Sequence, residues 1–361
     1  MDTADFDYDL PEVRIAQQPV EPRDAARLLV DRGPAVDVGS APSIDHRHVR
    51  DLADLLDPGD LLVTNTTRVL AARLHLVKRD TGGAAEVLLL EQRPDLGNGC
   101  WEALVRPGGR LPAGTVLTNP VTPELLTVEV GAELGDGVRL VTLSLDGNAS
   151  GDLAAGIAAT GEMPLPPYIK ERLADPDRYQ TVYADPDRAD SSAAPTAGLH
   201  LTPALLDAVA DRGIRMATVD LTVGLGTFRP IKVDRIEDHP MHAERYRVPQ
   251  ATLDACAETT GRGGRVVAVG TTTVRALESA AATGELEGHT ELFIRPGFEF
   301  QVVDRMVTNF HQPRSSLLVM IDAFVGDRWR ALYAEALAGD YRFLSFGDAM
   351  LLTRHDRWAL V

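Results

Sequence analysis

The stretch AAPTAGLHLTP, residues 193–203, separates two kinds of sequence pattern in this chain. Acidic, proline-rich loops precede it, and alternating helix-like and strand-like segments follow it. Its end predicts a helix start, because Thr202 is a favoured N-cap residue and Pro203 is favoured at the first helical position. The stretch therefore predicts where loops give way to an α/β arrangement.

Four residues just before that helix start carry chemistry. Thr196 offers a hydroxyl, Ala197 and Gly198 offer bendable backbone, and His200 offers an imidazole. Backbone N–H groups, a hydroxyl and an imidazole at a helix N-terminus favour a bound anion or a polar small molecule. The alternative is a tight loop in which Gly198 supplies a positive φ and His200 is packed. The local pattern leaves both interpretations open.

Composition predicts a globular protein. The chain has 361 residues, 44% hydrophobic and 25% charged, and this length favours two domains. No apolar run approaches the ~18 residues of a membrane span, and no basic region with an apolar core opens the chain. Cys100 and Cys256 are isolated, which is typical of a reducing compartment. We expect a cytoplasmic monomer with no membrane attachment.

The charge balance limits the kinds of partner. The chain carries 53 acidic and 36 basic residues, a net charge of −17. Non-specific nucleic-acid binding relies on a broad basic surface, so this balance argues against it. A small basic patch that docks one defined RNA stays compatible with the composition.

Short apolar runs between residues 69 and 149 differ in pattern from the rest of the chain. Glycine-rich and proline-glycine turns separate them, a spacing that is typical of a small antiparallel barrel or sandwich. We therefore predict an all-β, barrel-like domain at 69–149. It interrupts an α/β main domain, formed by 1–68 and 150–361, with a mixed sheet and flanking helices. The runs are Leu70–Val77, Ala85–Leu90, Trp101–Val105, Leu125–Val130 and Val138–Leu145.

In the predicted main domain, polar or flexible residues follow several apolar strands. Open α/β sheets bind ligands at the carboxyl ends of their strands, so these residues are candidates for substrate binding. Solvated turns are the alternative. The candidates are Asn65 and Arg68 after 61–63, Gly224, Gly226, Thr227 and Phe228 after 214–223, Gly270, Thr271 and Thr272 after 265–269, and Thr308, Asn309 and His311 after residue 307.

Two of these strand ends allow more specific statements. The glycines at 224 and 226 lack the third glycine of a dinucleotide-binding loop, and Pro230 forbids an immediate helix, so a nicotinamide cofactor is not expected. The hydroxyls at 271 and 272 open a helix whose N-terminus can hold a carboxylate or phosphate. Arg275 and Glu278 on this helix are ligand candidates, although their spacing also allows an internal salt bridge.

The segment 236–244 is the densest ionisable cluster. His239, His242 and Glu244 could bind a metal, but Pro240 interferes with a single helical face. Acid/base work by His242 with Glu244 is the favoured interpretation, and plain surface charge is the alternative. Upstream, the rings of Tyr179 and Tyr183 could stack on a base or serve as buried anchors.

Taken together, these motifs resemble the S-adenosylmethionine:tRNA ribosyltransferase-isomerases of queuosine biosynthesis. The matching stretches span nearly the whole chain in order. They are Leu10-Pro11, Pro58–Val63, Asn65 with Thr67-Arg68, Met163–Ile169, Tyr179–Ala184, Ala193–His200, Val223-Gly224 with Gly226-Thr227-Phe228, Glu237–His239 with Met241-His242, Val269–Thr272 with Val274-Arg275 and Glu278-Ser279, Thr308–His311, and Gly347–Met350.

The resemblance implies a fold and a reaction. The family's α/β domain is interrupted by a β-barrel, in agreement with the domain prediction above. Its members move the ribosyl part of S-adenosylmethionine onto 7-aminomethyl-7-deazaguanine in tRNA, releasing adenine and methionine and leaving epoxyqueuosine. They need no cofactor beyond S-adenosylmethionine as co-substrate. Such a site requires a base, a polar cradle for methionine and an adenine pocket.

The chain departs from the family pattern in the strand before Gly224. Family members usually carry a histidine where this chain has Thr222, with Asp220 two residues earlier. A hydroxyl cannot accept a proton as an imidazole does, so Asp220 or His242 would have to be the base. We therefore expect two alternatives beside the family reaction. One is a diverged paralogue with a free small-molecule acceptor or altered chemistry, and the other is a non-catalytic S-adenosylmethionine-binding protein.

Overall fold

The computed structural model describes residues 1–33, 43–108, 111–135, 137–145, 152–186, 189–224 and 230–356. The chain forms two compact units. The first comprises Met1–Thr67, Pro166–Asp185 and Ala194–Val361, and the second comprises Arg68–Leu165 and Pro186–Ala193. The second unit therefore contains more of the chain than the expected insert at 69–149. Within the described ranges, none of the helices has both the length and the apolar character needed to cross a bilayer.

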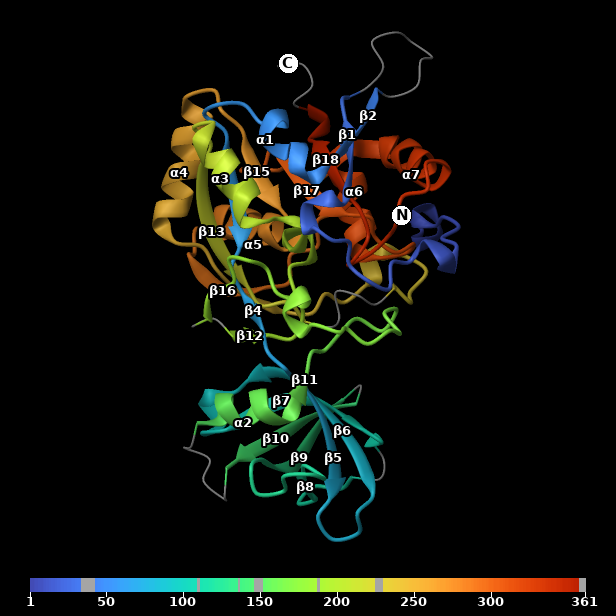
Figure 1. The fold of residues 1–361 in the computed structure, drawn as a ribbon, viewed down its shortest axis with the longest axis vertical. Helices are drawn as coiled ribbons and strands as arrows, with labels where there is room; N and C mark the ends of the chain where they lie inside the picture. The colour runs from blue at the N-terminus through green and yellow to red at the C-terminus, as the bar shows by residue number, and fades with distance from the viewer. Residues whose placement is uncertain are drawn as a thin grey trace. The chain divides into compact units, whose positions relative to one another are not determined.

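A nine-stranded mixed sheet forms the centre of the first unit (Figure 1). Four neighbouring strands, β13, β3, β15 and β17, run parallel, whereas β14, β16, β18 and β2 each form antiparallel pairs. The strand order across the sheet is β16 (Glu287–Thr290), β14 (Glu244–Arg247), β13 (Arg215–Leu221), β3 (Leu61–Asn65), β15 (Val266–Val269), β17 (Arg305–Asn309), β18 (Ala349–Thr353), β1 (Arg27–Asp31) and β2 (Ile44–His48).

The central strands are buried along their whole length, because helices cover the sheet. Every residue of β3, β15, β17 and β18 is buried, as is typical of strands with both faces covered. Side chains of α1 and α3 pack with those of the strands in one apolar core. The helices of this unit are α1 (Leu52–Leu55), α3 (Pro203–Asp211), α4 (Gln250–Gly261), α5 (Thr271–Thr283), α6 (Ser316–Val325) and α7 (Trp329–Ala338).

The helix start predicted at Thr202 is confirmed. Helix α3 begins at Pro203, and the Thr202 hydroxyl accepts a hydrogen bond from the backbone N–H of Leu205. The apolar residues of 48–56 recur at helical spacing, which predicts a helix, and this prediction is largely confirmed. Residues 49–55 are helical, as the 3-10 turn Val49–Asp51 followed by α1, whereas His48 ends β2. The apolar side chains of this segment lie in the core, so the apolar spacing indicated both the helical turns and the face that they bury.

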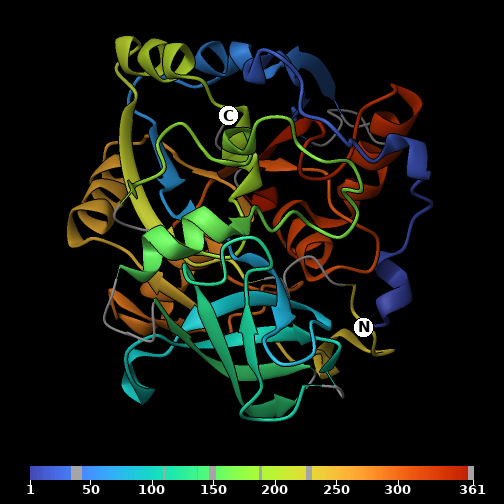
Figure 2. The same ribbon diagram turned by 60° about the horizontal axis from the view of Figure 1, so that its bottom comes forward.

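The second unit contains a closed antiparallel barrel (Figure 2). Its ring is closed because the last strand, β8, pairs back with the first, β5. Buried and exposed side chains alternate along most of these strands, as a filled barrel requires. The all-β insert predicted from the turn spacing is thus confirmed. The ring order is β5 (Arg73–Lys78), β6 (Ala84–Gln92), β7 (Cys100–Arg106), β10 (Val138–Ser144), β9 (Thr127–Gly135) and β8 (Val116–Thr118).

Short elements complete the second unit. Helix α2 (Leu153–Thr160) leads into β11 (Gly161–Glu162), which pairs with β5. The two-residue strand β4 (Arg68–Val69) pairs in parallel with β12 (Ala189–Ser191). Arg68, a predicted substrate-binding residue, therefore belongs to this unit.

Candidate active site

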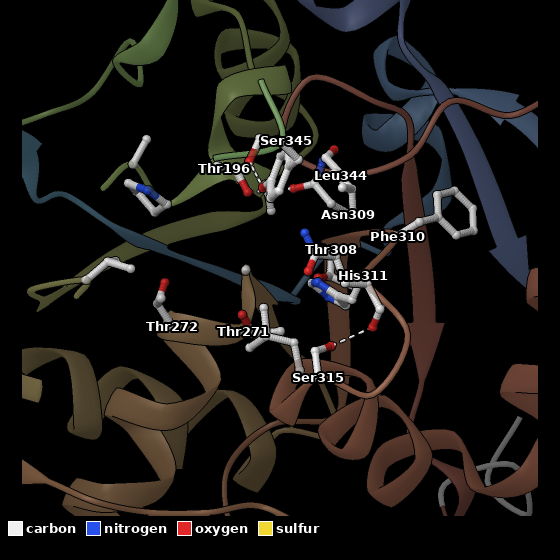
Figure 3. A pocket seen from close by; sticks show the side chains of 18 residues that line it. Thr196, Thr271, Thr272, Thr308, Asn309, Phe310, His311, Ser315, Leu344 and Ser345 are labelled. Atoms are coloured by element: carbon white, nitrogen blue, oxygen red, sulfur yellow. Dashed lines mark hydrogen bonds between the residues drawn. The ribbon is translucent and has the colours of Figure 1, made fainter. Parts of the chain in front are cut away.

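A cavity of about 590 Å³, counting its open mouth, lies at the carboxyl ends of the parallel strands in the first unit. This is the edge at which open α/β sheets bind ligands. Figure 3 shows Thr271 and Ser315 across the cavity from Thr196 and Ser345. The lining residues are Tyr168, Ala194, Pro195, Thr196, Ala197, Val223, Gly270, Thr271, Thr272, Thr308, Asn309, Phe310, His311, Gln312, Ser315, Leu317, Leu344 and Ser345.

Asn65, at the end of β3, joins three segments beside this cavity. Its side-chain amide donates to the Leu221 carbonyl at 2.9 Å and to Thr272 Oγ1 at 3.3 Å. Its Oδ1 accepts from the backbone N–H groups of Thr67 and Leu221, each at 3.2 Å. Because Thr272 Oγ1 accepts from Asn65, the hydroxyl proton of Thr272 can be donated to a ligand.

The N-terminus of α5 supplies positive potential to the cavity. Gly270 has a φ of 91°, a backbone conformation that residues other than glycine rarely adopt. It is the N-cap of α5, and it has no side chain that could cap the first turn. Thr271 and Thr272 open the helix and line the cavity. The first N–H groups of a helix carry partial positive charge, so this end suits a carboxylate.

Asn309, at the end of β17, holds a second network together. Its Oδ1 accepts from Thr196 Oγ1 at 3.0 Å, and its Nδ2 lies 3.0 Å from His200 Nε2 and 3.2 Å from the Leu344 carbonyl. Since the amide nitrogen can only donate, His200 Nε2 is the acceptor and the proton of a neutral ring sits on Nδ1. The Nε2 lone pair of His200 is therefore occupied by Asn309.

Burial keeps His200 neutral. Desolvation, assisted by the charges of Arg342, Arg178 and Arg23, lowers the pKa of His200 from 6.5 to about 4. Among the described residues, the cavity lining includes Asn309 and Thr196 but not His200. The structure thus places this predicted catalytic residue behind the cavity wall, where it orients Asn309.

His311, in contrast, lines the cavity and is fixed on several sides. The ring Nε2 lies 2.9 Å from Thr308 Oγ1. The backbone N–H of His311 donates to the Tyr333 hydroxyl at 2.9 Å, and its backbone carbonyl accepts from the Tyr8 hydroxyl at 2.5 Å. Desolvation lowers the pKa of His311 from 6.5 to about 3, so the ring is neutral at pH 7. Its imidazole is thereby presented to the cavity uncharged.

A buried ion pair lies next to this cavity. Arg275 Nη1 donates to Glu244 Oε2, and the same guanidinium donates to the Leu292 and Thr290 carbonyls, each at 3.2 Å. Glu244 Oε1 accepts from the backbone N–H of Gly224 at 3.0 Å. Arg275 and Glu244 therefore connect α5 and β14 with the end of β16, the residues just after it, and the segment that follows β13.

The spacing of Arg275 and Glu278 allowed a salt bridge between them, and this prediction is wrong. Glu278 instead accepts hydrogen bonds from three consecutive backbone N–H groups, those of residues 301–303, at 2.8–3.1 Å. Desolvation raises the pKa of Glu278, although these three bonds counteract it. Its contacts are those of a buried structural anchor.

A second cavity of about 420 Å³, again counting its open mouth, shares Leu317 with the first. It brings together the predicted residues His239, His242, Glu244 and Arg275. His242 is exposed, and desolvation together with His242 lowers the pKa of His239. No group of three metal-ligating side chains suited to an ion occurs in the described parts of the chain. The other lining residues are Met241, Leu292, Phe293, Ile294, Ser316, Leu317 and Met320.

The remaining predicted residues lie in several places. Asp220 accepts from Thr66 Oγ1 at 2.8 Å, and the backbone N–H of Thr222 donates to the Arg245 carbonyl at 2.9 Å. Val223, rather than Thr222, contributes to the described lining of the first cavity. The predicted residues Gly226, Thr227 and Phe228 lie outside the described residues.

The two tyrosines pack as anchoring rings. Tyr179 is fully buried and makes an edge-to-face contact with Phe346, with ring centroids 5.9 Å apart. Tyr183 packs so close to Gly198 that a Cβ at position 198 would overlap its hydroxyl. Gly198 therefore permits a close approach; its φ is not positive, so the tight-loop interpretation was wrong in that respect.

Sequence reasoning missed several residues of the first cavity. Tyr168 and Ser345 line it, and their hydroxyl oxygens lie 2.7 Å apart. Ser315 also lines it and caps α6 by accepting from the Leu318 N–H. The proline-rich run before Tyr168 and the Ser-Ser pair before an apolar helix were the available signals.

We predict that Gly198→Ala destabilises the protein by about 1–3 kcal/mol, because the added methyl overlaps the Tyr183 hydroxyl. Gly261→Ala is the matched control, since a Cβ at the end of α4 meets open space. Urea unfolding monitored by circular dichroism measures both variants. Equal stability of the two would contradict the close packing of Tyr183.

The neutral His200 predicts a pH dependence of stability. Between pH 6.5 and about 4 the unfolded chain binds a proton at His200 that the folded protein does not. The free energy of unfolding therefore falls as pH decreases through this window, by about 1.4 kcal/mol per pH unit for one proton. His200→Gln keeps an acceptor for Asn309 but removes the titration. Its unfolding free energy, measured in urea from pH 7 to 4.5, should fall less steeply than that of the wild type, and identical slopes would refute the assignment.

The sequence profile of the family described as Queuosine biosynthesis protein matches residues 3–352. The S-adenosylmethionine:tRNA ribosyltransferase-isomerase of Synechococcus elongatus is 48% identical over 96% of this chain and 94% of its own length. That of Moorella thermoacetica is 48% identical over 96% and 98%. The crystal structure of the S-adenosylmethionine tRNA ribosyltransferase from Thermotoga maritima superposes with a TM-score of 0.53, at 38% identity and coverage of 96% and 99%. The chain therefore belongs to the queuosine biosynthesis family of S-adenosylmethionine:tRNA ribosyltransferase-isomerases.

Proposed function

We propose that this protein transfers the ribosyl portion of S-adenosylmethionine to 7-aminomethyl-7-deazaguanine in tRNA, giving epoxyqueuosine. Full-length similarity to enzymes named for this activity supports the proposal. The main structural support is the cavity at the strand ends. The uncapped start of α5 and several hydroxyl-bearing side chains line this cavity. The comparisons give no support to a diverged acceptor or to a non-catalytic binding protein.

The reaction makes defined demands on the site. The acceptor amine loses a proton and forms a bond to the ribosyl carbon skeleton, and a carbon next to the sulfonium also loses a proton, whose bonding electrons form a new bond within that skeleton. The C–S bond breaks with its electron pair leaving on sulfur, which gives neutral methionine, and adenine leaves with the electrons of the glycosidic bond and takes up a proton. No electrons pass to an outside acceptor. We therefore propose S-adenosylmethionine as the co-substrate with no further cofactor, and a monomer that acts in the cytoplasm, where tRNA is modified.

The first cavity suits S-adenosylmethionine. The N-terminus of α5 faces it and can hold the methionine carboxylate, while the hydroxyls of Thr196, Thr271 and Thr308 can bond the ribose or the amino group. The neutral imidazole of His311 adds no positive charge that would repel the sulfonium.

Product analysis tests the proposal directly. The protein is incubated with S-adenosylmethionine and with modified tRNA, with the free aminomethyl-deazaguanine base, or with neither, and released adenine and methionine are quantified. We expect release only with modified tRNA, together with epoxyqueuosine in the tRNA. Release with the free base alone would support a small-molecule acceptor, and no release in any mixture would overturn the proposed activity.

We predict that Thr272→Val weakens S-adenosylmethionine binding by roughly 5–30-fold, the loss of one hydrogen bond to a charged or polar group. Asn65 keeps its bond to the Leu221 carbonyl in this variant, so the local backbone should stay in place. Calorimetric titration measures the dissociation constant. Thr260→Val, on the exposed side of α4, is the control. Unchanged affinity in Thr272→Val would remove this hydroxyl from the ligand site.

His242 is our proposed base, since it is exposed at the second cavity and its ring can exchange protons with solvent. His242→Ala should lower the rate of adenine release by about 10²–10⁴-fold while the melting temperature stays close to that of the wild type. His289→Ala, an exposed histidine on β16, is the control. A destabilised His242→Ala with normal activity per folded molecule would show that the histidine is structural.

A further inference from the structure

The second cavity lies where a second substrate is needed. A group transfer requires both reactants to be held side by side in one orientation. Leu317 lines both cavities, and the consecutive residues Ser315 and Ser316 line the first and the second respectively. A ligand in one cavity would therefore lie next to a ligand in the other, with Leu317 at the start of α6 in reach of both.

We infer that the second cavity receives the base of the acceptor nucleotide, turned out of the RNA, while S-adenosylmethionine occupies the first. The inference rests on the proposed function and assigns a separate binding site to its second substrate. Its supporting observations are a fixed polar pair, apolar walls and an accessible rim.

The Arg275–Glu244 pair gives the cavity a rigid polar surface. Both side chains are about 95% buried, and hydrogen bonds to Gly224, Thr290 and Leu292 hold them in place. The pair sets carboxylate acceptors beside guanidinium donors. A guanine-type base has N–H donors beside a carbonyl acceptor on its pairing edge, and enzymes read extruded bases through this edge.

The walls suit the faces of a planar ring. Met241, Leu292, Phe293, Ile294 and Met320 provide apolar contact, and the methionines can adapt to its shape. The Phe293 and His239 rings meet edge to face at an interplanar angle of 74°. Aromatic side chains are the usual stacking partners of unpaired bases.

The rim of the cavity is open to a polymer-bound ligand. His242 is exposed, and His239 and Met241 are half-buried. A base that remains attached to its RNA must enter from the surface. Because burial lowers the pKa of His239, this ring does not add a positive charge against the aminomethyl group of the acceptor.

The methionine part of S-adenosylmethionine suits this cavity less well. The guanidinium of Arg275 is already neutralised by Glu244 and bonded to two carbonyls, so it has little attraction left for a carboxylate. The uncapped helix end, which does attract a carboxylate, faces the first cavity. The charges therefore favour S-adenosylmethionine in the first cavity and the acceptor base in the second.

Binding measurements on Phe293→Ala test this assignment. The probes are a fluorescent anticodon stem-loop that carries 7-aminomethyl-7-deazaguanine at the wobble position, and S-adenosylmethionine itself. We expect the stem-loop to bind roughly 5–100-fold more weakly, because a stacking face is lost, and the dissociation constant of S-adenosylmethionine to stay unchanged. Phe298→Ala is the matched control, since Phe298 is half-buried on the same segment and packs on Phe300.

A second variant covers the case in which Phe293→Ala fails to fold. Met320→Trp fills the cavity from α6 and should also weaken the stem-loop but not S-adenosylmethionine. Weakened binding of S-adenosylmethionine with unchanged stem-loop binding would overturn the assignment, as would no change for either ligand. These titrations need no turnover, so a failure of the proposed activity would be seen separately, in the product analysis of the wild type.

Discussion

The buried contact between Arg275 and Glu244 is the interaction on which both cavities depend. Its hydrogen bonds connect four parts of the chain, which are the first turns of α5, the strand β14, the end of β16 with the residues just after it, and the backbone at Gly224. Removing one partner of such a pair leaves an uncompensated buried charge, which typically costs about 3–5 kcal/mol. Because α5 opens toward the first cavity while Arg275 lines the second, a single helix sets the geometry of both.

The histidines of the site divide into two groups by their surroundings. His200 and His311 are buried and uncharged, and each makes a hydrogen bond that fixes its ring beside Asn309 or Thr308. His242 is exposed, so a proton it accepts can pass to water. A positive charge on the buried rings would oppose a sulfonium substrate. Neutral buried rings are therefore compatible with such a substrate, and under the proposed function the base is the exposed His242.

Local sequence signals predicted much of this fold because they depend on neighbouring residues only. Thr202 and Pro203 determine where α3 begins, and Gly270 after the apolar run of β15 marks the start of α5. The polar residues after β3, β15 and β17 were predictable as site candidates, since parallel strands end at one edge. The helical turns at 49–55 were also predictable, because the apolar spacing of 48–56 places one of their faces against the core.

The partners of the site residues could not be predicted, because they come from distant segments. Glu244 and Arg275 are 31 positions apart, and Tyr8 reaches the carbonyl of a residue 303 positions away. Spacing suggested a bond between Arg275 and Glu278, but tertiary contacts gave each of them other partners. Likewise, the placement of His200 behind Asn309 depends on how β17 lies against the 3-10 turn Thr196–His200.

The acidic character of the chain bears on how it can select an RNA. With a net charge of −17, attraction for phosphates over the whole surface is weak, although phosphate contacts commonly supply most of the affinity for nucleic acids. A protein of this charge must obtain more of its selectivity from the modified base itself. A cavity with apolar walls and a preset carboxylate–guanidinium edge provides that kind of recognition, because its contacts are short-ranged and specific in shape. The net charge and the second cavity therefore favour the same mode of recognition, in which the base rather than the backbone identifies the substrate.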